Sequence, residues 1–250
     1  LVYRGDFALA TLMRFLPIIT QIFLWWAVFE SVRNSGDADI VGYRFEDMVA
    51  YYLLTMITRA FSSMPGLASG IARQVRNGEI KKFLIQPIDM VGFLLLNRIA
   101  HKLVYYSVAV LPFALVFFLC RGYFVDGWPD AGTMFAYVLS LIMAFLLGFF
   151  LEVSIGLIAF WFLEVTSLLF VYMLFGFFLS GHMFPLDMLP EPWGQMVDLL
   201  PLKYLAYFPA AVFLGKVTGM ELVRGLCVQA AWLIVFVATA RWMFRSGVKR

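Results

Sequence analysis

The sequence is poor in charge and in the residues that build metal or catalytic centres. Only 14% of its 250 residues are charged, and it holds two cysteines and two histidines. Cys120 and Cys227 show neither metal-ligand spacing nor a disulfide framework, so we interpret both as buried thiols. His101 and His182 fall toward opposite faces of the predicted membrane spans, too far apart to share a metal ion. We therefore expect no metal site.

Three motifs of catalytic and nucleotide-binding proteins are also missing. The sequence has no G-x-x-x-x-G-K-[ST] loop for nucleotide phosphates, no H-E-x-x-H zinc motif and no G-x-S-x-G nucleophile turn. A basic patch interleaved with aromatics, as nucleic-acid binding needs, is absent as well. We predict that the chain is not an enzyme and binds no cofactor or nucleic acid. If it works by ATP, another chain supplies the ATPase.

Long hydrophobic segments fill most of the chain. Hydrophobic residues make up 63% of it and the mean hydropathy is +0.87, more than a soluble domain can cover with polar surface. A helix needs about 20 mostly apolar residues to cross a bilayer, and six windows supply them. They are residues 9–30, 47–68, 93–119, 134–157, 163–181 and 222–244. We predict one all-α integral membrane domain over residues 1–250, and a natural amino terminus that extends beyond Leu1.

The distribution of lysine and arginine predicts how these spans are oriented. Basic residues concentrate in the loop between the second and third windows and at the end of the chain, "RWMFRSGVKR". Because Lys and Arg favour the cytoplasmic side, both termini and this loop are expected in the cytoplasm. The turn between the fourth and fifth windows supplies no basic residue. The prediction is a multi-pass protein of the cytoplasmic (inner) membrane.

Three charged residues lie in or beside the apolar windows. Arg59 falls near the middle of the second window, where it must face protein, water or a partner charge. It either lines a substrate path or a subunit seam, or it is neutralised by an acid such as Glu30 or Glu46. Glu152 and Glu164 flank the turn between the fourth and fifth windows. They are either solvated at the interface or bind protons in a transport cycle.

The basic loop contains two short amphipathic segments. Ile71 and Val75 share one helical face, and Ile80, Phe83 and Leu84 share the next. A glycine, Gly78, separates the segments, and a proline, Pro87, ends the second. One interpretation is an interfacial helix that rests on anionic lipid headgroups. The other is a knob whose apolar stripe fits a groove on a cytosolic partner.

Two stretches together resemble one known family. Residues 78–88 read "GEIKKFLIQPI", close to the pattern G-E-[LI]-x-x-[FL]-L-[IL]-x-P-[IV]. Before the last window the chain matches SG-x-x-x-P-L-x-x-x-P … L-P-[FL]-x-Y … P … LGK, from Ser180 to Lys216, and the "AFW" of residues 159–161 fits too. From about Phe7 to its end, the chain resembles permease subunits of ABC transporters of the ABC-2 type, in the branch long catalogued as a domain of unknown function.

The resemblance implies a six-helix permease that dimerises and docks two cytosolic ABC ATPases, which carry ATP and Mg²⁺. The dimer would contain either two copies of this chain or this chain and a sister permease. The cargo is expected to be amphipathic, lipid-like or drug-like. The loop at about residues 69–90 would be the coupling helix that contacts the ATPases. Its predicted contact residues are Arg73, Arg76, Gly78, Glu79, Ile80, Lys81, Lys82, Phe83, Leu84 and Pro87.

The segment before the last window is too rich in proline to span as one regular helix. It has five prolines between Ser180 and Pro209, and broken backbone at membrane depth must be packed against protein or water. The resemblance suggests two re-entrant half-helices on the outer face, over about residues 181–215, that gate release of cargo. The predicted gate residues are Gly181, Pro185, Pro190, Pro201, Tyr204, Pro209 and Gly215.

Two other functions stay open at this point. One is a secondary transporter driven by proton binding at Glu152 or Glu164, for which paired inverted halves are expected. The other is a membrane scaffold that does not transport. The direction of transport, export or import, is also open, although export is the prediction.

Overall fold

The computed structural model describes residues 13, 16–34, 39–86, 88–125, 127–162 and 164–249. Within these ranges the regular structure is helical apart from one isolated bridge between Ile40 and Tyr43. The helices are α2 (Leu16–Asn34), α3 (Phe45–Ser62), α4 (Leu67–Arg76), α5 (Lys81–Ile85), α6 (Met90–Leu119), α7 (Ala131–Leu157), α8 (Thr166–Leu179), α9 (Trp193–Asp198), α10 (Tyr207–Phe213) and α11 (Gly219–Val248). The 3-10 turns are η1 (Arg121–Tyr123), η2 (Ile158–Phe160), η3 (Leu186–Met188) and η4 (Pro201–Leu205).

Three described helices are long and apolar enough to cross a membrane: α6, α7 together with η2, and α11. They correspond to the third, fourth and sixth predicted windows. The other three windows overlap α2, α3 and α8, which have 19, 18 and 14 residues. The membrane-protein class is therefore confirmed, and the full six-span arrangement stays a prediction.

The predicted single helix over residues 47–68 is broken. α3 ends at Ser62, the backbone is extended at Ser63, and α4 starts only after Gly66. Pro65 explains the break because the residue before a proline avoids the helical region. Gly66 then has φ +74°, a left-handed conformation that glycine adopts without strain. The chain can thus change direction between α3 and α4.

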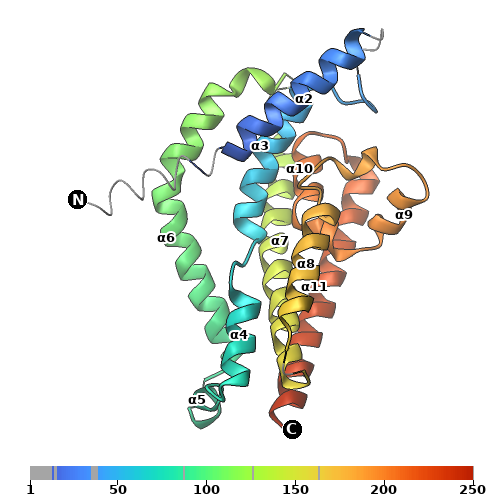
Figure 1. The fold of residues 1–250 in the computed structure, drawn as a ribbon. Helices are drawn as coiled ribbons and strands as arrows, with labels where there is room; N and C mark the ends of the chain where they lie inside the picture. Colours follow the sequence, from blue (N-terminus) through green and yellow to red (C-terminus); the bar gives the residue numbers. More distant parts are fainter. Residues whose placement is uncertain are drawn as a thin grey trace.

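α7 lies at the centre of the bundle and packs against α3, α4, α10 and α11 (Figure 1). Two of its glycines allow this close packing. A Cβ atom at Gly148 would lie 2.2 Å from the carbonyl oxygen of Ser62 at the end of α3. At Gly156 it would lie 2.8 Å from the carbonyl oxygen of Ala68 in α4. Both contacts place backbone directly against backbone.

The buried apolar residues form two clusters, one toward each end of α7. The first unites α3, α7, α10 and the segment around η4, with Leu53, Leu147 and Val212 fully enclosed. The second unites α4, α5, the start of α6 and the end of α7, with Ile71, Met90 and Val153 fully enclosed. Both clusters contain residues of α7, so this central helix connects the two ends of the molecule.

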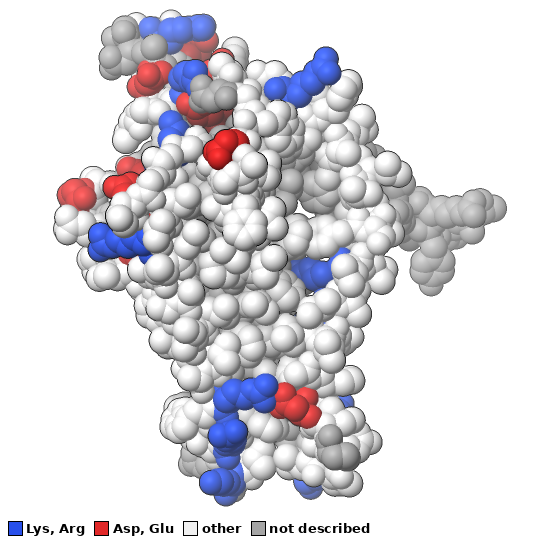
Figure 2. Space-filling model, turned by 180° about the vertical axis from the view of Figure 1, so that it is seen from behind, with Lys and Arg blue, Asp and Glu red and all other residues white. Residues whose placement is uncertain are grey.

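α6 and α11 are largely exposed along their length, as membrane-facing helices are expected to be. Figure 2 agrees, because charged side chains gather at the two ends of the molecule and the band between them is almost uncharged. Cys227 is exposed on α11 and Cys120 is only half-buried. The interpretation of both as buried thiols is therefore wrong for the single chain, because few side chains of the described bundle cover these faces.

Candidate functional site

The basic loop folds as two short helices at the lower end of the molecule, next to the carboxyl terminus of α11 (Figure 1). α4 and α5 are joined through Gly78, which has φ +70°. Ile71, Ile80 and Phe83 are buried in the lower core cluster, and Val75 packs against it. The apolar stripe is thus turned toward the protein itself. The hypothesis that this whole stripe fits a partner's groove is wrong.

A different set of side chains faces outward from these helices. Leu84 and Ile85 are exposed apolar residues, and Ile85 is 84% exposed. α4, α5 and the turn between them also carry exposed charged side chains. We name this surface the basic tip: Arg73, Arg76, Glu79, Lys81, Lys82, Leu84 and Ile85. Pro87, predicted to belong to it, lies outside the described residues.

The basic tip is anchored to α7 at the start of α4. The backbone N–H of Ala68, the second residue of α4, donates to the Glu152 carboxylate at 3.3 Å. A carboxylate at this position also interacts favourably with the helix dipole. The close contact at Gly156 lies one turn further along α7. Glu152 therefore caps α4, a role that neither of its two sequence interpretations included.

Lys102 anchors the same region from α6. Its ammonium group donates to the carbonyl oxygens of Ala60 and of Ser63, the latter at 2.8 Å. Unpaired carbonyls at a helix carboxyl end attract a cation. Lys102 and Arg98 also act electrostatically on Glu152. The break between α3 and α4 is thus held by a cation on one side and a carboxylate on the other.

Glu164 lies in the turn between η2 and α8, outside the helices. Its carboxylate accepts from the backbone N–H of Thr166 at 2.8 Å and lies 4.0 Å from the Arg76 guanidinium. The hydrogen bonds from Thr166, with a smaller effect of Arg76, lower the pKa of this carboxyl group. Glu164 is consequently ionised at neutral pH, and its carboxylate is already used by the first N–H group of α8. Both observations argue against Glu164 as a proton-binding residue of a transport cycle.

Arg59 lies on α3 without an acidic partner among the described residues. Glu30 pairs with Arg33 at 2.6 Å instead. Glu46 starts the same helix, so it lies about 20 Å away along the axis. The guanidinium carbon of Arg59 is 5.9 Å from the centre of the Phe177 ring. The interpretation that Glu30 or Glu46 neutralises Arg59 is therefore wrong.

Arg59 instead lines a cavity of about 690 Å³ between α2, α3 and α6, closed on one side by Phe177 and His182. Figure 2 shows a hollow in the uncharged middle band, with basic atoms visible within it. His101 also lines this cavity. The two histidines were predicted at opposite faces of the membrane, whereas in the structure both line the same cavity.

The segment after α8 is fastened to α3 by tyrosines. The hydroxyl groups of Tyr51 and Tyr52 donate to the carbonyl oxygens of Gly181 and Met183. Gly181 has φ +83°, and a Cβ atom there would meet both Tyr207 and the Tyr51 hydroxyl. The turn that follows α8 is consequently held in one position against the bundle.

The predicted gate segment contains the expected short helices. α9 begins directly after Pro192, and η4 and α10 occupy the place of the second half-helix. Every residue of α10 is buried, in contact with α3 and α7, whereas α9 lies at the side of the upper end (Figure 1). Among the predicted gate residues, Gly181, Pro185, Tyr204 and Pro209 are buried, Pro201 is half-buried, and Pro190 and Gly215 are exposed.

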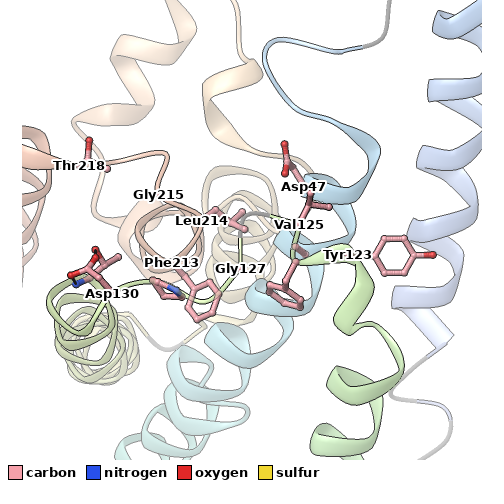
Figure 3. A pocket seen from close by; sticks show the side chains of 13 residues that line it. Asp47, Tyr123, Val125, Gly127, Asp130, Phe213, Leu214, Gly215 and Thr218 are labelled. Atoms are coloured by element: carbon pink, nitrogen blue, oxygen red, sulfur yellow. Dashed lines mark hydrogen bonds between the residues drawn. The ribbon is translucent and has the colours of Figure 1, made fainter.

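A second cavity, of about 250 Å³, lies at the upper end between α3, α7 and α10. Figure 3 shows its two acids, Asp47 and Asp130, on opposite sides. Asp47 is paired with Arg44 at 2.9 Å and faces Lys216 at 3.8 Å. Asp130 caps α7 by accepting from the N–H of Gly132 at 2.9 Å. Both carboxylates thus stabilise the start of a helix, α3 for Asp47 and α7 for Asp130.

These features define a helical integral membrane protein with a charged segment anchored at one end. The chain belongs to the ABC-2 transporter family, because the family model described as "ABC-2 family transporter protein" matches residues 15–250. No curated protein and no solved structure matches the chain. The family match confirms the resemblance seen in the sequence. Members of this family are transport permeases, typically non-catalytic, that generally work with ABC ATPase partners.

Proposed function

We propose that this chain is the transmembrane permease subunit of an ATP-driven exporter of amphipathic, lipid-like or drug-like molecules. It works as a pair of permeases, two copies or this chain with a sister, with two cytosolic ATPases that carry ATP and Mg²⁺. Both termini and the basic tip face the cytoplasm, and six helices cross the inner membrane. The family match supports the transport class, and the contacts of α4 with α7 and of the segment after α8 with α3 support the coupling and gating roles.

The basic tip is the proposed docking surface for the ATPase. Its exposed apolar pair, Leu84 and Ile85, is flanked by Lys81 and Lys82. A small apolar anchor with a charged rim is the usual composition of a specific interface. Because the larger apolar stripe is already buried in the protein, the tip stays fixed to the bundle when the ATPase moves it.

The single observation that carries this proposal is the attachment of the tip to α7. The Ala68–Glu152 hydrogen bond and the backbone contact at Gly156 link α4 to α7 directly. α7 in turn packs against α3, α10 and α11. A displacement of α4 by the ATPase would therefore reach the upper core cluster without a flexible connection. This supports the tip as the coupling element.

The segment from Ser180 to Gly215 is the proposed outer gate. α10 is enclosed by α3 and α7, which is the environment that broken backbone needs at membrane depth. Its anchors on α3 belong to the helix whose lower end leads into the tip. Closure of the ATPases would then be transmitted to the cargo exit through α3 as well as α7.

The test is isolation of this chain from its native membrane in mild detergent, followed by identification of stoichiometric partners. The proposal predicts a partner with a phosphate-binding loop, captured by the unaltered chain and lost with Lys81→Glu/Lys82→Glu. The matched control is Arg121→Glu/Arg224→Glu, an equal charge reversal at exposed residues of the opposite end. Loss of the ATPase in both variants, or in neither, would contradict docking at the basic tip. A scaffold without transport would tolerate both reversals.

A further inference from the structure

The cavity lies between α2, α3 and α6, where the α6 backbone stands away from α3 but side chains still bridge the two helices. The buried residues of α6 are Met90, Val91 and Leu94, in its first turns. At the other end α6 packs against η1. In its middle, Lys102 donates to the end of α3 and the Tyr106 ring stacks on Phe61 of α3, although the two helix backbones are separated (Figure 1). The cavity volume of about 690 Å³ lies within the range of small-molecule binding sites, about 300–1,000 Å³.

Most of the cavity wall is apolar. The α6 side supplies an apolar surface that runs about 14 Å along the helix, from Val104 to Phe113. This surface consists of Val104, Val108, Ala109, Pro112 and Phe113. α2 and α3 add Ile18 and Met56 on the facing side. An apolar ligand chain would be transferred here from water or lipid without loss of hydrogen bonds.

The polar groups of the cavity are incompletely paired. The Arg59 guanidinium has no ion pair with any described acid, and it lies 5.9 Å from the centre of the Phe177 ring. The Nε2 atom of His182 and the Oε1 atom of Gln21 are both buried and have no hydrogen-bond partner within the described chain. Both residues line the same cavity as Arg59. Buried polar atoms and an arginine at membrane depth normally have partners.

His182 is oriented by its neighbour. Its Nδ1 atom lies 2.6 Å from the Ser180 hydroxyl oxygen. When the serine hydroxyl donates to Nδ1, the imidazole proton is on Nε2, which then acts as a donor. Arg59 and His182 would in that tautomer supply donors for one acceptor group. Arginine matches carboxylate and phosphate oxygens especially well because its N–H groups form a planar fork.

We infer that this cavity binds a single-chain amphiphile with an anionic head group, which pairs with Arg59 and His182 while the chain lies along α6. The ligand's charge would neutralise Arg59, and its apolar chain would fill the α6 side. The inference deepens the proposed function by naming the charge and shape of the cargo. Binding itself, however, does not require the ATPase and can be measured alone.

The test is equilibrium binding of tritiated oleate to the purified chain in phosphatidylcholine nanodiscs, against oleyl alcohol and oleylamine of the same chain length. The unaltered protein is expected to bind oleate at least about tenfold more tightly than either. Tritiated oleoyl lysophosphatidate distinguishes a phosphate from a carboxylate head, and preference for either anion supports the inference. Equal affinity for the charged and uncharged chains would overturn it, and this comparison needs no variant.

Two variants localise the site. Arg59→Gln is expected to remove the preference for the anion and to leave oleyl alcohol binding unchanged. Arg121→Gln removes a guanidinium outside the cavity and serves as the control. Retained anion preference in Arg59→Gln would overturn the inference. ATPase capture is assayed in the same preparations to separate the ATPase-docking proposal from the amphiphile-binding inference. If oleate binds but no ATPase is captured, only the proposed function is contradicted.

Discussion

The contact between α4 and α7 gives the sharpest prediction for stability. A Cβ atom at Gly156 would lie 2.8 Å from the Ala68 carbonyl oxygen and 2.9 Å from the Ile71 Cβ atom, whereas ordinary contacts begin at 3.4 Å. Gly156→Ala must therefore push α4 away from α7 or distort either helix. Overpacking of this kind costs about 1–3 kcal/mol, and the Ala68 carbonyl is backbone that cannot rotate aside.

The matched control is Gly176→Ala. Gly176 lies within α8, and a Cβ atom there would meet nothing within 4 Å. Both variants gain about 1 kcal/mol in helix propensity, so this gain cancels when they are compared. We expect Gly156→Ala to be less stable than Gly176→Ala by the overpacking cost alone. For a chain of this size that is a difference of roughly 2–12 °C in Tm.

The assay is thermal unfolding of both purified variants in the same detergent, with ATPase capture as the functional measurement. Displacement of α4 is expected to weaken capture in Gly156→Ala but not in Gly176→Ala. Equal melting temperatures, or a more stable Gly156→Ala, would refute the close backbone contact. The basic tip would then have no close backbone contact through which to move α7.

Three further predictions concern other contacts. Tyr51→Phe removes the hydroxyl that donates to Gly181, so we expect a loss of about 1–3 kcal/mol and faster amide exchange around residue 181; unchanged exchange would contradict the anchor. Glu152→Leu removes the cap of α4 and is expected to cost about 0.5–2 kcal/mol, whereas Glu152→Gln keeps an acceptor and costs less; equal unfolding midpoints for the two would contradict the cap. The hydroxyl of Thr133 and two backbone N–H groups lower the pKa of Asp130 below its ordinary value of 3.8. The stability that ionised Asp130 contributes to the fold is therefore complete above pH 3.8 and is lost as the pH falls through the lowered pKa. In a series of melting curves at different pH, Asp130→Asn should make Tm depend less on acid pH.

Hydropathy predicted the long helices well because each one buries or presents apolar residues over its whole length. α6, α7 and α11 fall within a few residues of their windows. The break at Ser63 was missed because a window average does not register the sequence Met64–Pro65–Gly66, although proline followed by glycine is a turn signal. The extent of an apolar run therefore predicted the three long helices better than it predicted the continuity of the second window.

Less of the candidate site could be predicted from the sequence. The basic loop and its charges were recognised, but periodicity shows only that an apolar face exists, and not which surface covers it. Ile71, Ile80 and Phe83 proved to face the protein's own core. Residues joined by long-range contacts left no local pattern. Tyr51 and Gly181 are separated by 130 positions, and the cavity around Arg59 combines four segments.

The most direct test of the central claim is photo-crosslinking from the basic tip in native membranes. A photoreactive amino acid would replace Ile85, whose exposed side chain is at the tip, and Leu199, which is 74% exposed in the opposite half, would carry the same probe as the control. We predict that the probe at position 85 labels an ATPase with a phosphate-binding loop and that the probe at position 199 does not. Labelling of no ATPase from position 85, or equal labelling from both positions, would contradict the proposal that the basic tip couples this permease to ATP hydrolysis.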